Sequence, residues 1–169
     1  MQDKVAQYLC ESGYSASSPR VIETARGCVE VDVYVESPDV LVKTIICECK
    51  YWNGAVTKEK VHAFRTVVND SGASLGLIIA KTGFLSGVAE AARFSNVQLL
   101  TWQDFVERIS EKWMNYQLKE LQRICHPLVV FTDPLDIPIE DVSQHGKERY
   151  LQKCRDAIPV ITACFNLII

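Results

Sequence analysis

The feature that most constrains this fold is a strictly alternating segment followed at once by an apolar one. In VEVDVYVE, residues 29–36, every second residue is a valine, which predicts a strand with the valines on one face and Asp32 on the opposite, polar face. The turn residues SPD lead into VLVKTIICECK, residues 40–50, which predicts a second strand. Because the connection is so short, the two strands should pair antiparallel as a β-hairpin.

Helix and strand patterns alternate along the chain beyond this hairpin. A hairpin followed by alternating helices and strands predicts an α/β fold, in which α-helices flank both faces of a mixed β-sheet. Before the hairpin, SASSPR at 15–20 indicates a loop or an irregular edge, and Val21 and Ile22 indicate the start of a strand. The expected helices cover 3–12, 58–70, 86–94 and 102–113, and the expected buried strands cover 75–81 and 97–101.

The domain organisation follows from where these patterns end. We assign residues 1–115 to one compact domain and residues 116–169 to a short C-terminal appendage, which is a specificity element, a dimer arm or the start of another unit. FTDPLDIPIED, 131–141, indicates turn and linker structure. The apolar tail, 157–169, is shorter than the roughly 18 residues of a membrane span and predicts a buried strand or helix. Its abrupt apolar end is consistent with a piece of a longer protein.

Composition sets limits on partners and compartment. The net charge is −3 and the pI about 5.6, so binding to nucleic acid would need a local basic patch. Seven cysteines occur without a CxxC pair or a signal peptide, which predicts reduced thiols in a cytoplasmic protein. The alternative, a zinc site, lacks histidines at ligand spacing. Cys47 and Cys49 should point the same way from their strand and pack as small apolar side chains.

Three charged residues occur in these strands, where isolated charges are costly unless they are paired, hydrated or bound to a metal. Glu48 and Lys50 are two residues apart, so both side chains leave the same face of the strand. The hairpin can bring Asp32 beside Glu48, and two adjacent carboxylates repel each other unless a cation lies between them. A structural ion pair on a half-exposed strand face remains the alternative.

Hard oxygen ligands with room for water suit Mg²⁺, so Asp32, Glu48 and the backbone carbonyl of Cys49 are the expected metal ligands. Such an ion polarises a phosphodiester and lowers the pKa of a bound water. Lys50 would face the same pocket, where it can position the attacking water or stabilise negative charge on phosphorus.

These segments, together with GASLGLIIAKTGF and NVQLLTW, resemble the Mrr-like branch of the PD-(D/E)XK nucleases over residues 3–105. The resemblance implies a restriction-endonuclease-like fold and hydrolysis of DNA with Mg²⁺, for which Mn²⁺ can substitute, in type IV restriction or defence against foreign DNA. It gives the metal-ligand roles to Asp32 and Glu48 and the catalytic lysine role to Lys50. Val31 replaces the motif proline. Gln2 stands nearest the usual first-helix glutamate, where it can hydrogen-bond a metal-bound water without adding charge.

The DNA partner would need phosphate contacts near this site. Tyr51 and Trp52 would either stack on a base or pack as core aromatics. Double-strand cleavage needs two active sites, which favours a homodimer. The candidate phosphate contacts, each with a solvated surface cation as the alternative, are Arg20, Arg26, Lys43, Lys58, Lys60, Arg65 and Lys81.

Two other functions remain open from the sequence. One is a catalytically inactive DNA-binding or protein-interaction module on the same fold, which the acidic pI and Gln2 favour. The other is a structure-specific or RNA nuclease, whose metal site would be identical.

Overall fold

The computed structural model describes residues 1–51, 54–132 and 142–166. Trp52 and most of the expected linker, 131–141, lie outside the described residues. The chain divides into two compact units, Met1–Trp113 and Met114–Ile169. In the part of the chain that is described, no helix is both long enough and apolar enough to cross a membrane.

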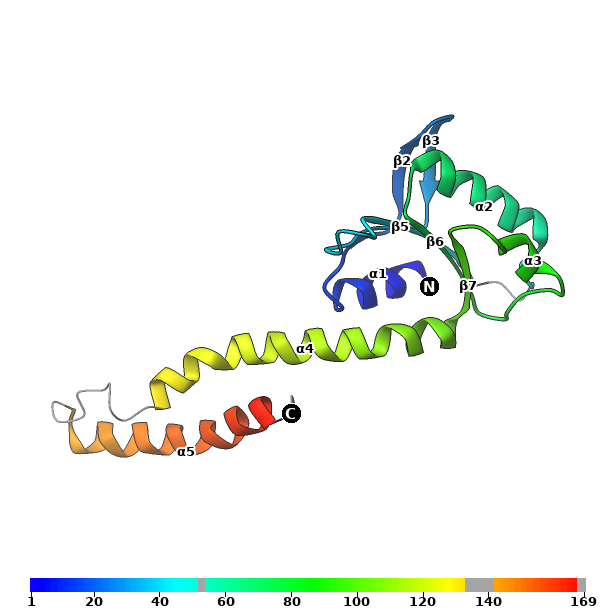
Figure 1. Ribbon diagram of the computed structural model, residues 1–169. Coiled ribbons are helices and arrows are strands. Elements are labelled where there is room, and N and C mark those ends of the chain that lie inside the picture. Colours follow the sequence, from blue (N-terminus) through cyan, green and yellow to red (C-terminus); the bar gives the residue numbers. More distant parts are fainter. Residues whose placement is uncertain (52–53, 133–141, 167–169) are drawn as a thin grey trace. The chain divides into compact units, whose positions relative to one another are not determined.

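The first unit is built on a five-stranded mixed sheet in the order β1-β4-β5-β6-β7 (Figure 1). The strands β5, β6 and β7 are parallel, and β4 pairs antiparallel with both β1 and β5. A separate antiparallel pair, β2 and β3, forms a hairpin. The bounds are β1 Ser15–Ser17, β2 Arg20–Thr24, β3 Gly27–Val31, β4 Val33–Glu36, β5 Thr44–Lys50, β6 Leu75–Ala80 and β7 Val97–Thr101.

Helices cover both faces of this sheet, which confirms the predicted α/β architecture (Figure 1). On one face, α2 and α3 bury side chains such as Phe64 and Val88 against Ile46 and Ile78. On the other face, α1 and the start of α4 pack on a second core cluster, which contains Cys47 and Cys49 as predicted. The helices are α1 Gln2–Cys10, α2 Lys58–Ser71, α3 Val88–Ala92, α4 Trp102–Thr132 and α5 Gln144–Asn166.

The alternating segment is not the single strand that the sequence predicts. The chain bends at Asp32, between β3 and β4. Val29 and Val31 therefore pack in the cluster under α2, whereas Val33 and Val35 pack in the cluster under α1. The prediction that all four valines share one face is wrong, because a bend interrupts the two-residue alternation of an extended strand.

Several predicted boundaries also differ. Of the two alternatives for 15–20, the edge is the one present, as the short edge strand β1, and the expected helix 86–94 is reduced to α3. Residues 40–43 precede β5 as a loop, in which the Asp39 carboxylate accepts the N–H of Leu41 at 2.8 Å. Such a side-chain acceptor replaces a strand partner and leaves Leu41 exposed.

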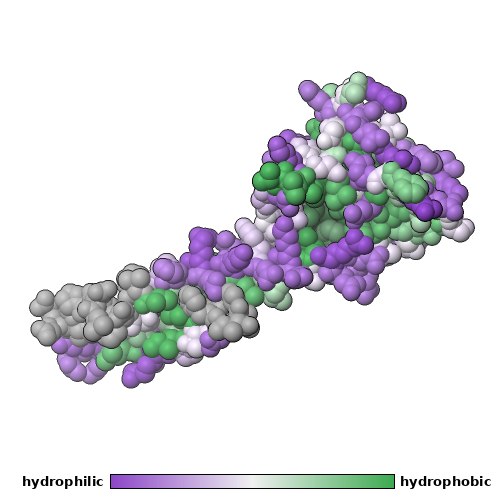
Figure 2. Space-filling model, in the orientation of Figure 1, coloured by the Kyte–Doolittle hydropathy of each residue, from purple (hydrophilic) through white to green (hydrophobic). Residues whose placement is uncertain are grey.

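The second unit is helical. Here α4 continues well beyond the predicted end at 113, with Pro127 inside it. Residues 157–166 of the tail belong to the helix α5, which fits the helix alternative, but Ile158 and Val160 are not buried as predicted, since they are 49% and 53% exposed. Apolar side chains reach the surface of this unit (Figure 2).

Packing of α2 on the sheet depends on a residue without a side chain. A Cβ at Gly76 in β6 would lie 2.5 Å from Val68 Cγ2 and 2.9 Å from Phe64 Cε1. We predict that Gly76→Ala destabilises the fold by about 1–3 kcal/mol, because α2 must shift or repack. Thermal melting measures this loss. The control is Gly54→Ala, whose Cβ would meet nothing within 4 Å; equal melting temperatures for the two variants would contradict the prediction.

Candidate active site

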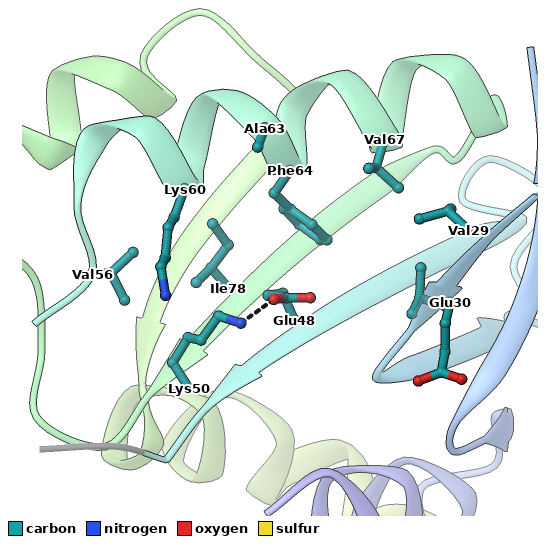
Figure 3. A pocket seen from close by; sticks show the side chains of 11 residues that line it. Val29, Glu30, Glu48, Lys50, Val56, Lys60, Ala63, Phe64, Val67 and Ile78 are labelled. Carbon is teal, nitrogen blue, oxygen red and sulfur yellow. Dashed lines mark hydrogen bonds and ion pairs between the residues drawn. The ribbon is translucent and has the colours of Figure 1, made fainter. Parts of the chain in front are cut away.

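An ion pair between Glu48 and Lys50 lies at the C-terminal end of β5. Both side chains leave the face of the sheet that α2 covers, and the Lys50 ammonium contacts Glu48 Oε1 (Figure 3). The two side chains are only 28% and 19% exposed, respectively. They line a pocket of about 330 Å³, here called the Glu48 pocket, under the α2 residues Ala63, Phe64 and Val67.

Two more charged side chains line the Glu48 pocket. Lys60 reaches from α2 toward the sheet, and its ammonium lies on the same side as Lys50 (Figure 3). Glu30 comes from β3 and points away from the Glu48–Lys50 pair (Figure 3). The pocket thus places two ammonium groups beside one carboxylate, which suits a site that contacts phosphate oxygens.

Asp32 occupies the bend where β4 separates from β5. The last pair of that ladder is Val33 with Cys47, and beyond it the Cys49 N–H donates to Asp32 Oδ2 at 2.6 Å. The carboxylate therefore takes the place of a strand carbonyl. Continuing the same register would set Asp32 opposite Glu48, as predicted, but the bend turns its side chain to the Cys49 amide.

The pocket beside Asp32 lies on the α1 side of the sheet. It measures about 370 Å³ and is here called the Asp32 pocket. Its polar lining residues are Gln2 and Asp3 from α1 together with Asp32 and Lys50, and Met1, Cys49 and Tyr51 also line it. Lys50 lines both pockets, whereas Asp32 and Glu48 each line only one of the two. Lys50 thus has Glu48 beside it on the α2 side of the sheet, and Asp32 with the predicted Gln2 on the α1 side.

The thiol of Cys49 is excluded from the chemistry by its surroundings. Burial, together with the nearby charges of Asp32 and Glu48, raises the pKa of this thiol to about 12. A thiol with that pKa stays protonated near neutral pH and is a poor nucleophile there. Cys47 is likewise buried, with its pKa raised by burial.

These residues offer a divalent cation oxygen donors. Only one Asp32 oxygen accepts the Cys49 amide, and only Glu48 Oε1 contacts Lys50. Each carboxylate therefore retains an oxygen, which fits the preference of Mg²⁺ for one or two carboxylates supplemented by water. Among the described residues, no group of three His, Cys, Asp or Glu side chains forms a metal site. The ligand set expected from the sequence, these two carboxylates and the Cys49 carbonyl, therefore stays a prediction.

The predicted phosphate contacts lie at three kinds of position. Lys60 and Lys81 lie in pockets that share a lining residue with the candidate site, whereas Lys43 lies beyond the opposite end of β5 from Lys50. The other four each contact a group elsewhere in the first unit. Arg65 donates to the Ala91 carbonyl at 2.7 Å, Arg26 pairs with Asp70 at 2.9 Å, Lys58 pairs with Glu90 at 3.8 Å, and Arg20 lies 4.2 Å from the Tyr34 ring centroid.

Sequence reasoning assigned no role to Lys4 or Trp102, although both line a pocket next to Asp32. Tyr51, which lines that pocket too, is 61% exposed and is not the core aromatic that one reading favoured. The sequence relates Trp102 to Tyr51 only because each directly follows a strand. Parallel pairing of those strands places both residues at the same edge of the sheet.

We predict a structural role for Asp32 beside any catalytic one. Asp32→Ala removes the acceptor of the partly buried Cys49 N–H and should lower the free energy of unfolding by about 1–3 kcal/mol, whereas Asp32→Asn retains an oxygen acceptor and should cost less. Urea denaturation measures both. Asp39→Ala is the control, because its equivalent bond to Leu41 lies in an exposed loop where water replaces it. Equal losses for the Asn and Ala variants would show that the bond is unimportant.

Comparison with known proteins relates this geometry to a family. The Mrr_cat family model, described as "Restriction endonuclease", matches residues 1–109, which carry both pockets. A search of the curated proteins found no match.

A crystal structure described as "Protein of Unknown Function AF1548" is similar, with a TM-score of 0.54 and 16% sequence identity over 99% of this chain and 96% of that chain. At this identity the likeness shows the fold alone, and it agrees with the predicted restriction-endonuclease-like fold. Because the family match spans well over half of the sequence, the chain belongs to the Mrr-like restriction endonuclease family.

Proposed function

We propose that this protein is a magnesium-dependent endonuclease that hydrolyses DNA phosphodiester bonds, in type IV, Mrr-like restriction or defence against foreign DNA. The observation that carries the proposal is the convergence of Asp32, Glu48 and Lys50 at the end of β5, inside the region that matches the family. Family membership supports the nuclease class and a DNA substrate.

Asp32 and Glu48 would hold the metal ion, together with the Cys49 carbonyl. When bound, a Mg²⁺ ion supplies Lewis acidity to the scissile phosphate and lowers the pKa of a coordinated water. Mn²⁺ would substitute, since it takes the same oxygen ligands. The hydrogen bond from the Cys49 amide fixes the Asp32 carboxylate, so that this ligand is oriented before substrate arrives.

Lys50 would act on the phosphate. Its ammonium contacts Glu48, and Lys50 lines both the Glu48 pocket and the Asp32 pocket. Release from Glu48 would leave a point charge to stabilise negative charge on the phosphorus oxygens in the transition state. Lys60, in the Glu48 pocket, would bind a neighbouring phosphate and contribute affinity without sequence selectivity.

We predict that the purified protein nicks or linearises supercoiled plasmid only with Mg²⁺ or Mn²⁺, and that EDTA abolishes cleavage. Glu48→Gln and Lys50→Ala should each lower the cleavage rate by roughly 100-fold or more, because each removes a charge required in the transition state. Gel electrophoresis over time measures the rates.

The matched control for these variants is a second glutamate–cation pair. Glu120 and Arg123 pair at 2.9 Å on α4 in the second unit. Glu120→Gln and Arg123→Ala should cleave as the wild type does. Cleavage that survives both Glu48→Gln and Lys50→Ala would refute the assigned site, and a wild-type protein that binds DNA without cutting it would indicate the inactive binding module.

A separate prediction concerns the metal alone. Lys50 competes with a cation for Glu48, so Lys50→Met should bind Mg²⁺ more tightly even though it cannot cleave. A gain of roughly fivefold, about 1 kcal/mol, is expected for a partly exposed pair. Isothermal titration calorimetry with MgCl₂ measures the change, with Arg123→Met as the control. Unchanged or weaker binding would mean that Glu48 does not ligate the metal.

A further inference from the structure

A third pocket lies beside the candidate active site. It measures about 340 Å³ and is lined by Met1, Lys4, Tyr51, Lys81 and Trp102; we call it the aromatic pocket. Met1 and Tyr51 also line the Asp32 pocket, so the two are adjacent. Their lining charges differ, because the Asp32 pocket has two carboxylates whereas the aromatic pocket has two lysines and no acid.

The sheet itself assembles the aromatic pocket. In the register of the parallel strands, Lys50 pairs with Ala80 and Ala80 with Thr101. Tyr51, Lys81 and Trp102 are the residues that directly follow these three, so they form the next row at the carboxyl ends of β5, β6 and β7. The Lys81 N–H also donates to the Lys50 carbonyl at 3.0 Å. Ligands of open α/β sheets bind at this edge.

Two aromatic residues line this pocket, of which Tyr51 lies outside the core and Trp102 packs against its edge. Tyr51 is mostly exposed, and the Lys81 ammonium lies 4.6 Å from its ring centroid. The Trp102 ring packs against Tyr8 and Phe105, with centroids 6.0 and 5.8 Å away, which fixes its position beside the pocket. An exposed aromatic ring with a cation over its face is ready to stack on another planar group.

We propose that the aromatic pocket binds an unpaired base of the DNA strand that lies in the active site. The proposal rests on the proposed nuclease function. A base would stack on Tyr51 or Trp102, while Lys4 and Lys81 would contact the phosphates on either side of it. This combination of aromatic faces and cations is the one that proteins use for single-stranded nucleic acid, since every base has a face that can stack.

The proposal defines a substrate class. A base inside a duplex is stacked on both sides and cannot enter a pocket at the end of the sheet unless it is unpaired. The preferred substrate is therefore DNA whose strand is single or splayed next to the scissile phosphate. Intact duplex would bind more weakly, because unstacking a base costs free energy.

The first test is binding of the full-length protein to a short fluorescein-labelled DNA strand, the matching blunt duplex and an RNA strand of the same sequence. Calcium replaces magnesium to limit cleavage, and fluorescence anisotropy gives each Kd. We expect the DNA single strand to bind most tightly. Tyr51→Ala should weaken single-strand binding roughly tenfold, whereas Tyr51→Phe, which keeps the ring, should not. Lys81→Ala should weaken it as well.

Matched controls use similar pairs elsewhere in the first unit. Phe94 is 91% exposed with the Arg93 guanidinium 4.7 Å from its ring centroid, and it lines neither the Asp32 pocket nor the aromatic pocket. Lys112 lies 3.8 Å from the Tyr14 ring centroid. Phe94→Ala and Lys112→Ala should leave the Kd for the DNA strand unchanged.

A second measurement locates the base directly. Ultraviolet crosslinking of a DNA strand that carries 5-iodouracil, followed by peptide mass spectrometry, should attach the base to Tyr51 or Trp102. Crosslinks confined to other residues, or wild-type affinity in Tyr51→Ala, would overturn the base-binding site. Tighter binding of RNA or of the intact duplex would overturn the assigned substrate.

Plasmid cleavage by the same preparations separates the two proposals. Magnesium-dependent cleavage together with an unaffected Tyr51→Ala Kd would overturn the pocket and leave the nuclease standing. Crosslinking at Tyr51 without cleavage of any DNA would support the base site and overturn the nuclease.

Discussion

The parallel pairing of β5, β6 and β7 is the constraint on which both candidate sites depend. The connections between these strands contain α2 and α3, and both helices cover the same face of the sheet. The other face is left for α1 and the start of α4. Because side chains alternate along β5, Glu48 and Lys50 point toward α2 while Cys49 points toward α1. The same register aligns the strand ends, so residues from three separate segments meet at one edge.

The bend at Asp32 is the second constraint, and it links stability to chemistry. Where β4 leaves β5, the Cys49 N–H loses a strand partner, and a partly buried amide without an acceptor is costly. The Asp32 carboxylate supplies that acceptor and is thereby held rigidly beside Lys50. A candidate metal ligand is thus also a structural residue. Loss of activity in an Asp32 variant would therefore not identify a ligand without a measurement of stability beside it.

Local periodicity predicted the order and type of most elements in the first unit, the hairpin between β4 and β5, and the shared face of Glu48 and Lys50. It could not predict the bend at Asp32. The valines before and after Asp32 are buried under different helices, but because all of them are apolar the alternation continues through the bend. Residues 40–43 were predicted as part of the strand for another reason. They are apolar at three of four positions, but the Asp39 side chain holds them in a turn, where Val40 and Leu41 are exposed.

The candidate active site and the aromatic pocket could be predicted only in part, because most of their residues are distant in the sequence. Glu48 and Lys50 are neighbours along one strand, so the sequence alone relates them. Lys4, Tyr51 and Trp102 are far apart in the chain, and only the sheet brings them to one pocket. The exposure of Tyr51 and the position of Lys81 over its ring can be known only from the packed structure.

The distribution of charge explains how an acidic chain can suit a nucleic-acid substrate. At physiological ionic strength, exposed charges are screened beyond about 8 Å, so a phosphate senses the nearest groups and not the net charge of −3. At the end of β5, acidic groups gather beside Asp32 while Lys50, Lys60 and Lys81 line the three neighbouring pockets. Carboxylates there repel DNA unless a cation is bound, whereas the lysines attract it. The acidic pI is therefore a poor guide to DNA binding by this chain, because the charges nearest the strand decide the interaction and the net charge does not.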